Sequence, residues 1–151
     1  MRVWRITRRK YAALDGEGAR LNGGRWNPEG VAVVYTSATL SLAALEYLVH
    51  VDIEDVPSDL ISMEIEVPDD AAQAVIALAD LAADWNAIDE HPECTAAGID
   101  WIQRGETLTL RVPSAVIPWE SNFLLNPRHS DSVRVTIVAT HDFAFDPRLL
   151  G

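Results

Sequence analysis

Two stretches of the chain alternate apolar and polar residues. Residues 60–67 read LISMEIEV, with an apolar side chain at every second position from Ile61, and residues 133–139 repeat the pattern. A period of two is typical of a strand with one buried face. Three further segments are rich in β-branched residues and are predicted strands: Arg2–Ile6, Val31–Tyr35 and Thr107–Val112.

Helical signals are fewer. Residues 38–51 are predicted as a helix with Ser37 as its N-cap, and residues 94–104 as a second helix that ends at Gly105. Residues 69–85 are Ala-rich and are predicted to contain a short helix, although their repeated Ala-Asp spacing is a weaker signal than that of the other two helices. Strands and helices do not alternate regularly, so we expect an α+β fold rather than a doubly wound sheet. The sheet should be mixed and mostly antiparallel.

Length and composition fit one domain over residues 1–151, because 48% of the residues are apolar and no linker interrupts the chain. The longest apolar run, residues 43–49, contains Glu46 and is far shorter than the roughly 20 residues that span a bilayer. The amino-terminal residues lack the apolar run of a secretory signal. Cys94 is the one cysteine, as suits a reducing compartment. We therefore expect a cytoplasmic protein with no membrane segment.

The charge of the chain is unevenly distributed. The total is −11, yet residues 1–25 carry seven basic and two acidic residues, a net +5 that leaves −16 for the remainder. Residues 26–103 contain no Lys or Arg. Such an acidic chain disfavours nucleic-acid binding, which requires many phosphates to be neutralised. A small anionic ligand needs only a local basic cleft, and the basic segment could supply one.

Glu46 is the most unusual residue of the predicted helix 38–51, because nearly all its helical neighbours are apolar. A helix that is apolar all the way round should be buried, and an ionised carboxylate inside it needs a partner or a polar cavity. The partner could be backbone donors or a salt bridge from Arg25. Arg25 follows Gly23 and Gly24 in the loop GGRWNPEG, where it could equally hold a phosphate while the glycines admit a ligand close to the backbone.

The segment LRVPSAVIPWESNFLLNPRHSD, residues 110–131, contains a second group of polar residues. Ser114 follows a proline at the end of a predicted strand, where its hydroxyl caps a turn or reaches a site. Asn126-Pro127 repeats the Asn27-Pro28 pair, and both are typical of turns. The four histidines lack metal-ligand spacing, so no metal is expected.

Seven motifs in order resemble the RES domain family, which is named for an arginine, a glutamate and a serine. They are VWRI at 3–6, GGRWNPEG at 23–30, VVYTS at 33–37, LAALEYLVH at 42–50, VPSAVIP at 112–118, NFLLNPRH at 122–129 and FDPRL at 145–149. They span nearly the whole chain. The middle, residues 52–104, carries little of the signature.

The resemblance implies an ADP-ribosyltransferase-like fold and a bacterial toxin of a type II toxin–antitoxin pair. Its substrate would be NAD, cleaved at the nicotinamide N-glycosidic bond by hydrolysis or phosphorolysis, with inorganic phosphate as the co-substrate in the second case and no cofactor. Matched residue by residue, the catalytic set is Arg25, Tyr35, Glu46 and Ser114, with Ser121 as a rival for the serine. Residues expected to contact the substrate are Arg5, Arg20, Gly23, Gly24 and Asn126.

Two alternatives stay open on the sequence. One is a toxin that transfers ADP-ribose to a protein, and the other is a silent module that binds an antitoxin or a nucleotide without turnover. The chain has no helix-turn-helix pattern, so the resemblance implies a separate Xre-type antitoxin that binds DNA itself and covers the toxin's pocket. Part of the acidic surface is expected to face this partner, and a homo-oligomer within the complex is possible.

Overall fold

A computed structural model describes all of residues 1–151. Its elements follow in chain order: β1 (Arg2–Arg8), α1 (Glu17–Asn22), β2 (Val34–Ser37), α2 (Leu40–Leu48), β3 (Leu60–Glu66), β4 (Gln73–Val75), α3 (Pro92–Arg104), β5 (Thr109–Pro113), β6 (Ser121–Leu125) and β7 (Thr136–Asp142). Short 3-10 turns lie at Arg9–Tyr11, Ile53–Asp55, Leu78–Asp80, Ser130–Arg134 and Pro147–Leu150.

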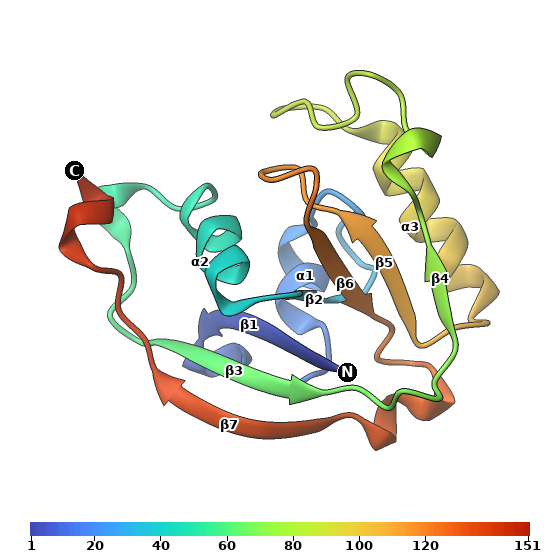
Figure 1. The fold of residues 1–151 in the computed structure, drawn as a ribbon, viewed down its shortest axis with the longest axis horizontal. Helices are drawn as coiled ribbons and strands as arrows, with labels where there is room; N and C mark the ends of the chain where they lie inside the picture. The colour runs from blue at the N-terminus through green and yellow to red at the C-terminus, as the bar shows by residue number, and fades with distance from the viewer.

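One sheet of seven strands runs through the molecule in the order β4-β5-β6-β2-β1-β3-β7. Only the β4–β5 pair is parallel, and every other pair is antiparallel. The expected α+β fold with a mixed, mostly antiparallel sheet is therefore confirmed. Figure 1 shows the sheet strongly bent, with β3 and β7 along the bottom and β4 and β5 rising on the right.

Helices α2 and α3 cover different parts of one face of this sheet. The α2 side packs Ala43 against Ile6, Leu60 and Phe145, and the α3 side packs Cys94 and Trp101 against strands β5 and β6. On the opposite face lies the largest apolar cluster, which joins β1, β2, β3 and β6: Val3, Val34, Ile61, Met63, Ile65, Val67, Leu108, Phe123 and Leu125. The two helices leave the middle strands β2 and β6 between them (Figure 1).

The regular patterns located most of the strands. Segments 2–6 and 60–67 correspond to β1 and β3, and 107–112 corresponds to β5, each within two residues at either end. The strand predicted at 31–35 is β2, which begins three residues later than expected, at Val34. The strand predicted at 133–139 is β7, which begins at Thr136 because residues 130–134 form a 3-10 turn. Helix α3 ends before Gly105 as expected, with that residue in the left-handed region at φ 60°.

Three expectations about helices were wrong. The Ala-rich stretch 69–85 forms β4 and a 3-10 turn rather than a helix, because β4 pairs in parallel with β5. Helix α2 begins at Leu40, and its N-cap is Thr39, whose side chain accepts a 3.1 Å hydrogen bond from the Leu42 amide. Nor is α2 buried all round, since Leu42 and Ala43 are buried whereas Leu45 is 37% exposed. No helix is long and apolar enough to cross a bilayer.

Candidate functional site

Glu46 lies on α2 and is only partly buried. One carboxylate oxygen, Oε1, accepts two short hydrogen bonds, from the Ser114 hydroxyl and from the Asn122 side-chain amide, each 2.6 Å long. No ion pair or protein hydrogen bond reaches the other oxygen, Oε2. The expectation that backbone donors or Arg25 would hold Glu46 is therefore wrong. Two neutral side chains hold this carboxylate, one directly after β5 and one on β6.

Ser114 is fully buried and follows directly on β5. Its hydroxyl oxygen accepts hydrogen bonds from the backbone amides of Val116 (3.1 Å) and Ile117 (3.0 Å). A hydroxyl carries one proton and two acceptor lone pairs, so the two amides direct that proton onto Glu46. The sequence suggested that Ser114 either caps a turn or reaches a site, and its hydroxyl does both.

Asn122 connects Glu46 to the sheet. Its amide oxygen accepts a 2.8 Å hydrogen bond from the hydroxyl of Ser37, the residue directly opposite it in the β2–β6 register. Trp4 lies opposite Ser37 on β1. Directly opposed residues of antiparallel strands share a face, so Trp4, Ser37 and Asn122 form a row beneath α2. Sequence reasoning missed Asn122 and Ser37 as site residues, although both stand in the quoted family motifs.

Tyr35 lies two residues before Ser37 and so faces the same side of the sheet. Its hydroxyl donates a 2.6 Å hydrogen bond to Asn27 Oδ1 and accepts a 3.1 Å bond from the Trp26 amide. Burial raises the pKa of Tyr35 well above its usual range. A Cβ on Gly24 would stand 2.8 Å from the Tyr35 hydroxyl oxygen. Packing against Tyr35 therefore accounts for Gly24, while Gly23 ends α1 at φ 70°.

Arg25 extends away from this tyrosine toward the segment that precedes α3. Its guanidinium donates 3.0 Å hydrogen bonds to the carbonyl oxygens of Trp85 and Ala87, and its own carbonyl accepts a 2.9 Å bond from the Thr95 hydroxyl. No acidic side chain pairs with it. The structure thus does not join Arg25 to Glu46. Arg25 fastens its loop to residues 85–87 and keeps its positive charge uncompensated, with three of its five N–H donors uncommitted.

Arg5 points to the face opposite the Glu46 cluster. It follows Trp4 on β1 and lies opposite Met63, which belongs to the apolar cluster of that face. Its Nη1 atom is buried without a hydrogen-bond partner, and burial lowers the pKa of Arg5 to about 10. Because Arg5 remains a cation at neutral pH, the fold contains a half-buried charge that Asp15 stabilises only through space, without an ion pair.

The structure separates three further candidates from the cluster. Arg20 is committed to Glu17 through hydrogen bonds of 2.8 and 2.5 Å. Asn126 is buried after β6, where its side-chain oxygen accepts a 3.0 Å bond from the Arg128 amide and shapes a turn. The Ser121 hydroxyl accepts a bond from the exposed Arg111 side chain, so of the two candidate serines only Ser114 contacts Glu46.

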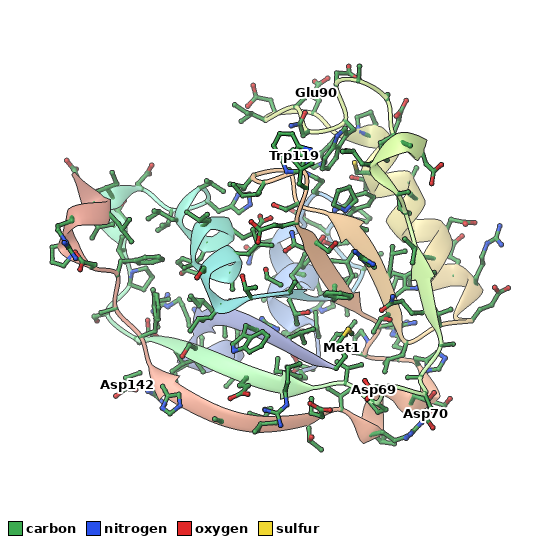
Figure 2. All side chains as sticks on the ribbon, in the orientation of Figure 1. Met1, Asp69, Asp70, Glu90, Trp119 and Asp142 are labelled. Carbon is green, nitrogen blue, oxygen red and sulfur yellow. The ribbon has the colours of Figure 1, made fainter.

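The loop that begins at Ser114 carries an exposed aromatic residue. Trp119 belongs to the loop between β5 and β6 that starts at Ser114, and 87% of it is exposed (Figure 2). Two open hollows of the surface lie elsewhere. One is lined by Leu48, Val51, Asp52, Ile53, Glu54, Asp55 and Leu149, and the other by Glu90, His91, Pro92, Thr95, Ala96 and Ile99. Neither of these two includes Glu46, and the candidate site is located by its hydrogen bonds.

The fold and the cluster define a small α+β domain with a carboxylate held at the junction of a helix and two strands. Comparison with known families then gives a specific answer. The RES domain model matches residues 2–146, and the chain belongs to the RES domain family. The resemblance seen in the sequence is confirmed.

Several curated relatives match along their whole length. A protein of Sphingobium sp. named "Prs ADP-ribosylating toxin" is 37% identical over 97% of this chain and 95% of its own length. Proteins named "Toxin Res" from Photorhabdus laumondii and Pseudomonas putida are 36% and 39% identical, and each match covers 99% of this chain, with 97% and 99% of the relative.

A solved structure shares the fold. The crystal structure of the M. tuberculosis MbcT-MbcA toxin-antitoxin complex contains a chain that superposes with a TM-score of 0.79, over 99% of this chain and 86% of that one. Sequence identity between the two is 21%, so this likeness concerns the fold alone.

Proposed function

We propose that this protein is a bacterial toxin that consumes NAD by breaking the bond between nicotinamide and ribose. The observation that carries the proposal is the state of Glu46: a partly buried carboxylate with one oxygen held by Ser114 and Asn122, the other oxygen free, and no cation in contact. A carboxylate fixed in this way is suited to a positive charge that appears only during the reaction.

Cleavage of NAD creates such a charge. As the C1′–N1 bond breaks, its electron pair moves into the pyridinium ring and releases neutral nicotinamide, while positive charge develops on the ribose, as in other glycoside cleavages. Glu46 Oε2 stabilises that charge and accepts hydrogen bonds from the ribose hydroxyls. The acceptor then bonds to C1′: water releases one proton to solvent as it does so, whereas phosphate bonds through an anionic oxygen that carries none. Water as acceptor yields ADP-ribose, and phosphate yields a phosphorylated ADP-ribose.

The other residues of the proposed set have supporting roles. Ser114 holds Glu46 in place through its directed proton. Arg25 binds the NAD pyrophosphate with its uncommitted N–H donors, since the guanidinium has no acid to neutralise it. Tyr35 maintains the loop that carries Arg25, through Trp26 and Asn27. We leave Arg5, Arg20 and Asn126 out of the set because their contacts point elsewhere.

Transfer of ADP-ribose to a protein is the second candidate. The Sphingobium relative is named an ADP-ribosylating toxin, and the exposed Trp119 lies on the loop that begins at Ser114. An exposed aromatic side chain beside a site is typical of a protein-contact residue. The same Glu46 chemistry would operate, with a side chain of the target protein as the acceptor.

A separate antitoxin completes the proposal. The solved structure with the same fold is a toxin-antitoxin complex, and a chain that depletes NAD needs a partner that silences it in its host. We therefore expect an antitoxin protein to bind this chain and block access to Glu46.

The decisive experiment incubates the purified protein with NAD, with and without inorganic phosphate, and follows nicotinamide release and the ribose product. Free ADP-ribose identifies a hydrolase, and a phosphorylated product formed only with phosphate identifies a phosphorylase. Replacing Glu46→Gln should lower the rate at least about 100-fold while the fold stays intact. Labelled ADP-ribose on a macromolecule would favour the second candidate, and an absence of nicotinamide under every condition would refute NAD consumption.

A further inference from the structure

The Glu46 carboxylate is held from two sides by different kinds of group. Ser114 approaches from the end of β5 and Asn122 from β6, and both bond to Oε1. A carboxylate can accept at either oxygen, and the side chain can rotate to exchange them. Concentrating both donors on one oxygen fixes the plane of the carboxylate and selects Oε2 as the oxygen left for substrate.

The orientation of the Asn122 amide is determined by chemistry. A carboxylate only accepts hydrogen bonds, so the nitrogen of the amide must face Glu46 and the oxygen must face away. That oxygen would be unsatisfied in this half-buried position without a donor. Ser37 supplies the donor at 2.8 Å, and Ser37 is itself 4% exposed. The carboxylate therefore sets which end of the amide faces it, and the Ser37 hydroxyl ties the other end of the amide to β2.

We infer that Asn122, anchored to β2 by Ser37, is a positioning residue that aims Glu46 Oε2 at the ribose. The inference rests on the proposed function. The chain of contacts runs from the sheet to the reacting centre, from Ser37 Oγ to Asn122 Oδ1 and from Asn122 Nδ2 to Glu46 Oε1. Neither Ser37 nor Asn122 needs to touch NAD, so their loss should affect the rate of the bound complex more than binding.

Four variants and a matched control test this. Asn122→Ala should lower kcat for nicotinamide release about 10- to 100-fold and leave KM for NAD within about twofold. Asn122→Asp keeps the size and still accepts from Ser37, but it sets a second carboxylate against Glu46. It should lower kcat further than Asn122→Ala does. A residue that merely supported the strand would give the opposite order, with Asp the milder change.

A double-mutant cycle tests the link to Ser37. Ser37→Ala should lower kcat about three- to tenfold alone and have no additional effect in the Asn122→Ala background, because its action passes through the amide. Thr36→Val is the control, since Thr36 also bonds β2 to β6, through the Phe123 carbonyl at 2.7 Å, but faces the opposite side of the sheet. It should leave kcat within about twofold.

Three results would overturn the inference: a rise in KM without a fall in kcat for Asn122→Ala, a milder effect of Asp than of Ala, or multiplying effects of the Ser37 and Asn122 changes. A wild-type protein that released no nicotinamide would refute the proposed function instead. In that case crystal structures of Ser37→Ala and Asn122→Ala decide the inference separately. A displaced Glu46 carboxylate supports it, and an unmoved one refutes it.

Discussion

At the scale of single residues, two charged side chains, Glu46 and Arg5, lack an ion-pair partner and differ in how far hydrogen bonds compensate for it. Glu46 lacks a cation but has two good donors on one oxygen. Arg5 lacks an acid, and one of its nitrogens has no partner at all. A buried charge without partners lowers stability, so a protein that retains one either uses it or tolerates it. Removing the charge should raise stability in either case, and the effect on NAD binding separates the two possibilities.

Replacing Arg5→Met should therefore stabilise the fold, by about 1–3 kcal/mol in the free energy of unfolding, because methionine fills similar space without a desolvated charge. Urea unfolding measures the change. Arg128→Met is the control, since Arg128 is exposed and its side chain makes no hydrogen bond, and it should alter stability by less than about 0.5 kcal/mol. A stabilised Arg5→Met protein with strongly weakened NAD binding would return Arg5 to the phosphate-binding role that the sequence suggested.

Tyr35 gives a prediction that depends on pH. Its folded-state pKa is raised by burial, so above a pH of about 10 the unfolded chain loses the phenolic proton while the folded chain retains it. The folded state then binds more protons, and stability falls as pH rises past that value. Urea unfolding between about pH 8 and pH 11 should show this decline, and Tyr35→Phe should flatten it.

The same substitution has a cost at neutral pH. Tyr35→Phe leaves the Trp26 amide and Asn27 Oδ1 without their partner, which should destabilise the fold by about 1–3 kcal/mol. Tyr47→Phe serves for comparison because no hydrogen bond to the Tyr47 hydroxyl is present, and it should change stability at neutral pH by less than about 0.5 kcal/mol. Equal losses in both variants would mean that the hydroxyl bonds of Tyr35 do not hold its loop.

At the scale of elements, the loop that carries Arg25 is held by α3 as well as by Tyr35. The Trp26 carbonyl passes so close to Gly98 that a Cβ there would stand 1.7 Å from its oxygen. The Thr95 hydroxyl bonds to the Arg25 carbonyl, and the buried Cys94 thiol bonds to the Trp85 carbonyl at 3.7 Å. Successive residues of α3 thus position both the arginine and the segment that its guanidinium contacts.

Gly98→Ala should separate these two elements. The methyl group overlaps backbone rather than a flexible side chain, so α3 or the loop must shift, and we expect a loss of about 3 kcal/mol or more in unfolding free energy. Ala96→Ser on the exposed side of the same helix should change stability by less than about 0.5 kcal/mol. Thermal unfolding of the two variants checks the contrast, and equal melting temperatures would contradict the close packing at Gly98.

The same comparison of elements shows what the sequence could predict. Strand β3 and helix α3 were located because periodicity and a terminal glycine are local signals. Strand β4 was missed because its only partner is β5, more than thirty residues away, and nothing in its own Ala-rich sequence specifies that pairing. The short helix α1 and strand β6 were not predicted either, since each offers too few residues for a period to be recognised.

In the candidate site, too, local signals were predictable and long-range contacts were not. Residue type alone singled out Glu46, since a carboxylate among apolar neighbours is unusual in a helix. Its actual partners could not be derived, because Ser114 and Asn122 lie 68 and 76 residues away and meet it only through the sheet register. Ser37 was expected as a helix cap, but its hydroxyl is directed at Asn122 and the capping role falls to Thr39.

At the scale of the whole molecule, ion pairs neutralise most of the positive charge of residues 1–25, which the sequence suggested as a basic segment. Arg2 pairs with Glu64 and Glu66, and Arg8 with Asp59. Arg9 and Arg20 also have acidic partners, Asp142 and Glu17. Among the seven basic residues of 1–25, the three without an ion pair are Arg5, Lys10 and Arg25. Acidic residues outside this segment that have no basic partner therefore account for the net charge of −11.

One acidic region also has the shape and the apolar residues of a contact surface. At the end of α2, the carboxylates of Asp52, Glu54 and Asp55 line an open hollow together with Leu48, Val51, Ile53 and Leu149. Of these, Ile53 and Leu149 are each 54% exposed. An apolar centre with a charged rim is typical of protein interfaces, and the charge here would attract a basic partner. The partner we expect for this chain is the antitoxin.

Reversing two of these charges, Asp52→Lys with Glu54→Lys, should weaken binding of the antitoxin encoded with this chain about tenfold at low salt, mainly by slowing association. The loss should shrink as salt is raised, because screening removes the attraction from the wild-type protein as well. Asp100→Lys with Glu106→Lys changes the charge equally and should have little effect, because Asp100 lies in α3 and Glu106 two residues after it. Figure 1 shows α3 on the right of the view, away from α2. Surface plasmon resonance at two salt concentrations measures both pairs of variants. Equal affinities for the two double variants would show that the partner binds elsewhere, and an affinity independent of salt would show that charge does not guide it.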